Sequence, residues 1–195
     1  MNLIANCGKK IILIAWIIFI LFTLIFSFSC LLFLILVLLH LFYKRVEREI
    51  TDYDNNTIVS PIDAKVVGIY VDEDNKNIVL TLEKNYFSLF LNSSEVRSVI
   101  KSEDIYKKQF NGLKYNDNFY SNATEIVFNK DISLILKPAK YCVNSFYDIK
   151  KAFKGQRIGF FSTGLVDIKL PYNCTLLVGM HDKILANADI AKIGE

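Results

Sequence analysis

The sequence predicts a mostly β protein: a single sandwich-like domain over residues 49–195, preceded by an N-terminal transmembrane helical hairpin within an anchor over residues 1–48. Three observations predict this class. No charged residue occurs between Ile11 and Tyr43, where Leu, Ile and Phe dominate. After residue 49, short β-branched or aromatic runs are bounded by Asn, Asp, Gly or Pro, as in strands and turns. No stretch there keeps a helical period over three turns.

The uncharged run is too long for one upright helix. It would span roughly 50 Å at about 1.5 Å per residue, against a hydrocarbon core of about 30 Å. Ser27, Ser29 and Cys30 interrupt its middle, so we expect two tightly linked helices over residues 11–26 and 30–43. Each is at or below the usual spanning length, so the hairpin either crosses the bilayer or dips into it. A single strongly tilted helix is the rival interpretation. A cleaved signal peptide is disfavoured because its apolar core would be shorter and followed by small residues.

The flanking charges predict the membrane side. Lys9 and Lys10 precede the run, and Lys44, Arg45 and Arg48 follow it. Positive charge at both ends is typical of a hairpin whose two ends are cytoplasmic. The four cysteines are scattered, which favours a reducing compartment. We therefore expect the inner (cytoplasmic) membrane, with the β domain on the cytoplasmic face.

Composition also argues against two kinds of partner. Acidic and basic residues are nearly balanced after residue 43, which is unlike a nucleic-acid-binding surface. With no Cys-x-x-Cys pair and only His40 and His181 as histidines, we expect no metal site. His40 lies at the inner end of the second limb, where a polar ring needs no special role.

Eleven strands are expected in the β domain. A polar turn over residues 72–77 joins the first two as a hairpin. Residues 103–123 are expected to form a long loop or an irregular hairpin. The expected strands are Ala64–Val71, Asn77–Leu82, Phe87–Leu91, Val96–Ile100, Glu125–Phe128, Ile132–Leu136, Tyr141–Phe146, Ile158–Phe161, Leu165–Leu170, Thr175–Val178 and Ile184–Ala186.

The C-terminal run resembles the ending of lipoyl-like β folds, where two tight turns join short strands. Gly179 keeps the first turn, and Asn187 stands where a second glycine is common. Asparagine tolerates the left-handed backbone such a turn needs. No lipoylated lysine motif is present, so the segment is expected to be structural.

The segment from Arg157 to Pro171, Arg-Ile-Gly-Phe-Phe-Ser-Thr-Gly-Leu-Val-Asp-Ile-Lys-Leu-Pro, resembles the self-processing segment of the phosphatidylserine decarboxylase family. There the run reads roughly Arg-x-Gly-x-x-x-Phe-Gly-Ser-x-Val-Asp-x-x-Leu-Pro, and the serine becomes a pyruvoyl cofactor. Here the interval between Gly159 and Val166 is one residue short, and the Gly-Ser pair is missing.

Three further segments, in the family's order, support the resemblance to its short, membrane-anchored members. The apolar run ends in Phe-Tyr-Lys-Arg over residues 42–45. Residues 58–67 are similar to Ser-Pro-Ala-Asp-Gly-Lys-Val, with Asp63 at the family's aspartate. Residues 87–96 are similar to Leu-Asp-Val-His-Val-Asn-Arg-x-Pro-Val, with Phe90 at the histidine position.

The resemblance implies a divergent member that does not mature. In the family an aspartate and a histidine activate the serine hydroxyl, which is a weak nucleophile until a base takes its proton. Without the pyruvoyl carbonyl there is no electron sink for decarboxylation. We thus expect no cofactor. Two interpretations of Asp63 stay open: the retained catalytic aspartate, or a turn residue after Pro61.

Two alternatives stay open. The first is an active, pyruvoyl-dependent decarboxylase that forms phosphatidylethanolamine after non-standard self-cleavage at Ser162 or Thr163, with His181 as a substitute base. The second is a membrane-anchored adaptor of an export system, with its β domain outside the cytoplasm. The favoured hypothesis is a pseudoenzyme that binds membrane lipid, through phospholipid headgroups, or a protein partner. Its candidate phosphate contacts are Lys84, Arg97, Lys137 and Lys140.

Overall fold

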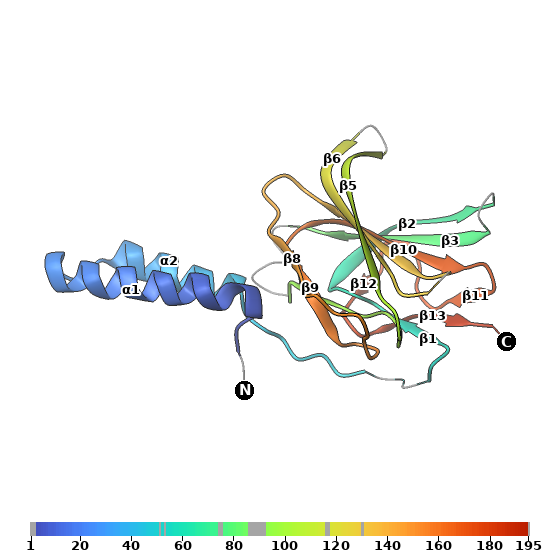
Figure 1. Cartoon of the computed structure of the whole chain (residues 1–195), viewed down its shortest axis with the longest axis horizontal. Coiled ribbons are helices and arrows are strands. Elements are labelled where there is room, and N and C mark those ends of the chain that lie inside the picture. The colour runs from blue at the N-terminus through green and yellow to red at the C-terminus, as the bar shows by residue number, and fades with distance from the viewer. Residues whose placement is uncertain are drawn as a thin grey trace.

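The computed structural model describes residues 3–50, 52, 54–73, 76–85, 93–115, 118–129 and 131–194, with residues 111–115 and 118–121 described by their backbone alone. The chain is mostly β and carries an apolar helical hairpin at its N-terminus (Figure 1). The expected strand Phe87–Leu91 and the position of Phe90 lie outside the described residues.

The hairpin forms where the sequence predicts it. A short 3₁₀ turn, η1 (Asn6–Gly8), leads into α1 (Lys9–Phe26), and α2 (Cys30–Phe42) returns beside it (Figure 1). Ser27 has a φ of 84° at the reversal, and the Ser29 hydroxyl accepts a hydrogen bond from the amide of Leu32 at the start of α2. A serine in that position satisfies one of the amides that lack a partner at a helix N-terminus.

Most side chains of the hairpin are apolar and exposed. The helical stretch from Asn6 to Phe26 is long and apolar enough to cross a membrane, whereas α2 is shorter. One helix of this kind near the N-terminus fits a membrane anchor or a signal sequence.

Thirteen strands are named in the described residues. They are β1 (Thr57–Val59), β2 (Ala64–Asp72), β3 (Asn77–Lys84), β4 (Glu95–Arg97), β5 (Tyr106–Tyr115), β6 (Asn118–Val127), β7 (Ser133–Pro138), β8 (Asn144–Phe146), β9 (Arg157–Phe161), β10 (Gly164–Pro171), β11 (Cys174–Leu176), β12 (Lys183–Ile184) and β13 (Asp189–Ile193).

These strands form one large sheet and two small ones. The large sheet has the order β12-β2-β3-β10-β7-β6-β5, and the small sheets are β1-β13-β11 and β4-β9-β8. The apolar core includes Leu80, Leu134, Phe161 and Ile168, all almost fully buried. Alternating apolar positions put Leu80 of β3, Leu134 of β7 and Ile168 of β10 on one face of the large sheet, and such alternation explains why the sequence located these strands well.

Several strand predictions need correction. The segment predicted as a long loop or an irregular hairpin over residues 103–123 is mostly regular strand, because β5 and β6 pair in register from Tyr106↔Val127 to Tyr115↔Asn118. The predicted strands at 96–100 and 141–146 are shorter, since only β4 and β8 form there. Tyr141 has a φ of 65°, which a strand does not permit. Strands β1 and β13, which pair with each other, were not predicted.

The base of the hairpin is seated on the β domain. Tyr43 is buried, with its ring 5.4 Å from that of Phe160 in β9. Gly8 lies against the same tyrosine, where a Cβ would come within 2.3 Å of the ring. In Figure 1, β8 and β9 lie on the hairpin side, and β11 and the C-terminus lie on the opposite side. The small β4-β9-β8 sheet is therefore the part of the domain closest to the hairpin.

Candidate functional site

Ser162, which follows β9, has its polar groups engaged with the chain before β8. It is buried, and its amide donates to the carbonyl of Val143 at 3.0 Å. Its hydroxyl oxygen accepts from the amide of Val143 at 2.8 Å and lies 3.4 Å from the sulfur of Cys142. A serine needs an oriented base within hydrogen-bond reach to become a nucleophile. Its contacts here are an amide donor and a thiol.

Thr163 and Gly164 fix the turn into β10. The Thr163 hydroxyl donates to the carbonyl of Lys84 at 2.8 Å, and its own carbonyl accepts from the amide of Ala139 at 3.2 Å. Gly164 has a φ of 136°, and a Cβ there would lie 2.2 Å from the carbonyl oxygen of Lys137. Only glycine fits such a position. Backbone contacts on both sides therefore hold the turn in place. The threonine hydroxyl is engaged as a donor to a carbonyl.

Asp63 is a buried structural carboxylate. It accepts from the backbone amides of Ser93 at 2.8 Å and Ala186 at 2.7 Å, and it forms an ion pair with Arg48 at 3.2 Å. Burial raises its pKa, but the bonds from Ala186, Arg48 and Ser93 outweigh it, so the pKa lies below its ordinary value. Among its hydrogen bonds in the described residues, none goes to Ser162.

Three of the four cations expected to contact phosphate are buried. Lys84 donates its ammonium to the carbonyl of Ser93, Arg97 donates to the carbonyl of Val46, and Lys137 pairs with Asp167. Their prediction as surface contacts is wrong, because a long cationic side chain in a β strand was assumed to be solvated. Lys140 is exposed.

Lys84 is the most perturbed of these cations. Burial lowers its pKa from 10.5 to about 8, and the nearby Asp63 carboxylate opposes the change only in part. Such a lysine keeps a buried cation near Asp63 at neutral pH.

Neither histidine belongs to this cluster. His181 is exposed in the turn before β12 with a φ of 71°, and its amide donates to the carbonyl of Val66. His40 lies in α2, where its Nδ1 contacts the carbonyl of Leu36 and its Nε2 lies 3.4 Å from the Trp16 nitrogen. Within the described part of the chain, His, Cys, Asp and Glu form no group of three or more that would hold a metal ion.

A network of ion pairs joins the segment after the hairpin to the small sheet. Glu95 in β4 is fully buried and pairs with Arg45 at 2.9 Å and with Arg157 at 2.6 Å. Arg157 also pairs with Glu47 at 2.6 Å. We call residues 44–48 the strap, because these pairs and the bond between Arg48 and Asp63 hold them on the domain. The sequence did not reveal the network, since its partners are far apart along the chain.

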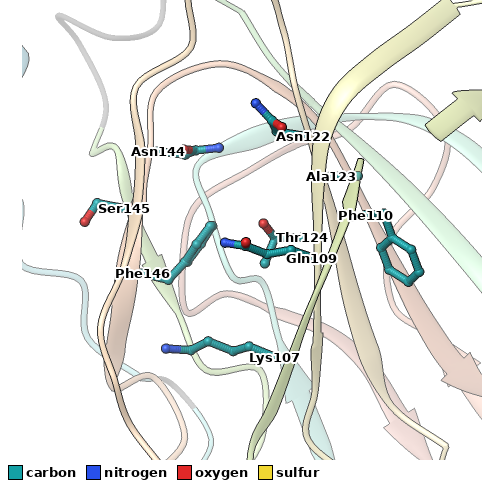
Figure 2. Close-up of a pocket in the computed structure, with 9 residues that line it drawn as sticks. All are labelled: Lys107, Gln109, Phe110, Asn122, Ala123, Thr124, Asn144, Ser145 and Phe146. Atoms are coloured by element: carbon teal, nitrogen blue, oxygen red, sulfur yellow. The ribbon is translucent and has the colours of Figure 1, made fainter. Parts of the chain in front are cut away.

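A polar groove opens between β5, β6 and β8. One cavity of about 330 Å³ is lined by Lys107, Gln109, Phe110, Asn122, Ala123, Thr124, Asn144, Ser145 and Phe146. Figure 2 shows Gln109, Thr124 and Phe146 pointing toward one another, while Phe110 points away. A second cavity of about 390 Å³ shares Asn122 and Asn144 with the first and reaches Lys140 and Cys142. We refer to both as the groove.

Comparison with protein-family models, curated proteins and solved structures finds no match for this chain. The assignment of a function therefore depends on the residues and contacts described above.

Proposed function

We propose that this protein is a membrane-anchored, divergent relative of the phosphatidylserine decarboxylases that does not process itself and that contacts anionic phospholipid headgroups at the membrane surface. The observation that carries the first part is the state of the two hydroxyls. The Ser162 oxygen accepts from an amide and faces a thiol, and the Thr163 hydroxyl donates to a carbonyl. Asp63, the retained aspartate, is already bonded to three donors.

The C-terminal segment supports the same kinship. Asn187 adopts a φ of 69°, as expected for a residue in place of a turn glycine, and the Gly179 amide donates to the Asp182 carboxylate in the first turn. The lipoyl-like ending and the sandwich-like arrangement are part of this proposal.

The seating of the hairpin supports the headgroup contact. The ion pairs of the strap and the packing of Tyr43 on Phe160 restrict the movement of the domain relative to the anchor. With the anchor in a bilayer, the β4-β9-β8 side of the domain would lie next to the lipid surface. The exposed Lys140 belongs to the loop that leads to β8, and lysine near an anionic surface is attracted to it.

Mass spectrometry of the purified full-length chain tests the loss of processing. We expect one uncleaved species at the intact mass of 22.4 kDa, and likewise one uncleaved species, at its own intact mass, for a Ser162→Ala, Thr163→Ala double variant. A C-terminal fragment that begins with a pyruvoyl group at position 162 or 163, and that the double variant lacks, would establish the active decarboxylase instead.

Amine footprinting in nanodiscs tests the headgroup contact. We expect modification of Lys140 to slow several-fold when phosphatidylglycerol replaces phosphatidylcholine. Lys192, which is exposed in β13, is the control and is expected to react at the same rate in both. Equal rates at Lys140 in the two lipids would contradict the headgroup contact.

A further inference from the structure

The groove between β5, β6 and β8 combines donors of several kinds with a single apolar wall. Lys107 supplies a cation, Gln109 and Asn144 supply amide N–H groups, and the buried Thr124 forms the floor with its hydroxyl. Phe146 forms the apolar side (Figure 2). This pattern of few polar groups around an apolar wall is typical of small-molecule sites, and the volume is within their range.

The charge of the groove favours an anion. Among the residues that line the two cavities, all of them described, there are two lysines and no carboxylate. Burial lowers the pKa of Lys107, and the negative charge of Asp148 opposes this only in part. Lys107 is the cation of the first cavity, and Asp148 is the charged group that acts on it.

The number of donors favours phosphate over a carboxylate. A phosphate monoester offers three strongly accepting oxygens, and lysine binds phosphate as a compact point charge. The ammonium of Lys107 and the amides of Gln109, Asn122 and Asn144 together provide donors for all three oxygens. The ring of Phe146 would then lie beside the organic part of the ester.

We propose that the groove is a binding site for a phosphate monoester, with Lys107, Gln109 and Asn144 as its main contacts. The ester is either a soluble compound or the headgroup of a lipid. If the ester is a lipid headgroup, the inference rests on the headgroup contact proposed above. If the ester is a soluble compound, the inference does not depend on that contact.

The strand geometry of β5 provides a matched control. Successive side chains of a strand point to opposite faces, so Lys107 and Gln109 face the groove while Lys108 faces away. The ammonium of Lys108 lies 5.0 Å from the ring of Phe110, which points away from the other lining side chains (Figure 2). Lys107→Met and Lys108→Met remove the same charge from neighbouring positions on opposite faces.

The test measures binding of glycerol 3-phosphate to the full-length chain in neutral detergent micelles by titration calorimetry. We expect Lys107→Met to weaken binding by about tenfold or more, the loss of one charge-assisted contact, and Lys108→Met to change it less than about twofold. Asn144→Asp, on an exposed position of β8, is expected to abolish binding because it places a carboxylate in the groove. Circular dichroism checks that each variant folds.

A second measurement distinguishes a soluble phosphate monoester from a lipid headgroup. In nanodiscs, competition between glycerol 3-phosphate and phosphatidic acid would identify a lipid-borne ester, and its absence would leave a soluble one. No binding by the wild type, or equal weakening by Lys107→Met and Lys108→Met, would overturn the site. Neither result would affect the mass measurement of the intact chain, so the two proposals fail separately.

Discussion

Asp63 receives donors from three segments that are far apart in the sequence. Arg48 belongs to the strap, Ser93 precedes β4, and Ala186 follows β12. The carboxylate therefore joins the anchor side of the chain to its C-terminal end. A buried, charged acceptor of this kind is costly to remove, because its donors are then left without partners.

Asp63→Asn is expected to lower the free energy of unfolding by about 3 kcal/mol. The amide group of asparagine must turn its NH₂ toward one of the donors that the carboxylate now satisfies. Urea unfolding of the full-length chain in micelles, followed by circular dichroism, measures the loss. Asp131→Asn, at an exposed position, is the control and should change stability by less than about 0.5 kcal/mol.

Lys84 is expected to make the free energy of unfolding depend on pH in the alkaline range. Its pKa is about 8 in the folded chain and 10.5 ordinarily, mainly through burial. Between these values the unfolded chain binds more protons than the folded one, so stability rises with pH. Relative to Lys84→Met, the wild type should gain about 2 kcal/mol between about pH 7.5 and 9.5. Urea unfolding across this range measures it. Lys183→Met, at an exposed site, should show a constant difference, and a constant difference for Lys84→Met would refute the buried amine.

The residue patterns predicted some of these roles and missed others. A turn after Pro61 was one of two interpretations of Asp63, and the structural interpretation agrees with its bonds to Ser93 and Ala186. The burial of Lys84 was not predictable, because a strand pattern tells which face a side chain takes and not whether a lysine there has a carbonyl to bind. The Glu95 ion pairs were missed because Arg45 and Arg157 are far from Glu95 along the chain.

At the scale of elements, the strap joins the helical hairpin to the β domain. Glu95 is buried with two arginines on it, one from the strap and one from β9. Breaking one partner of a buried pair leaves an uncompensated charge, which is strongly destabilising. The strap should therefore be protected from proteases while Glu95 is intact.

Glu95→Gln is expected to increase the rate of tryptic cleavage after Arg45 and Arg48 several-fold, because the strap loses its charged partner. Limited proteolysis of the reconstituted protein, read by mass spectrometry, measures it. Glu103→Gln removes an exposed carboxylate that pairs with Lys151 and should leave the rate unchanged, since such pairs contribute little. Equal rates in both variants would mean that the strap is held by the hairpin packing alone.

The elements differ in how well the sequence predicted them. The hairpin followed from an uncharged run with polar residues at its middle, and helix boundaries agree closely with α1 and α2. The β5–β6 segment was predicted as a long loop or an irregular hairpin because Asn111, Gly112 and Asn122 are typical turn residues. Pairing of β6 with β7, from Thr124↔Leu136 onward, supplies the tertiary context that overrides this local preference.

At the scale of the whole molecule, the side of the membrane can be tested with one thiol. Cys142 is partly exposed, whereas Cys174 is buried with its pKa raised by burial to about 11. In a variant that retains only Cys142, an impermeant maleimide should label everted vesicles and spare intact cells, because the positive residues flanking the hairpin favour the cytoplasmic side. Labelling in intact cells would favour the export adaptor.

The packing of Tyr43 on Phe160 and the pairing of Arg45 and Arg157 through Glu95 also set an order of events during synthesis. The ribosome releases the apolar helices long before it makes β9, so the proposed anchor would enter the bilayer before the surface that receives it exists. Until that strand emerges, Glu95 has no second arginine and Tyr43 has no aromatic neighbour from the domain. For the proposed anchor, assembly of the joint would follow insertion, and a chain truncated before β9 would be held at the membrane without a fixed orientation on it.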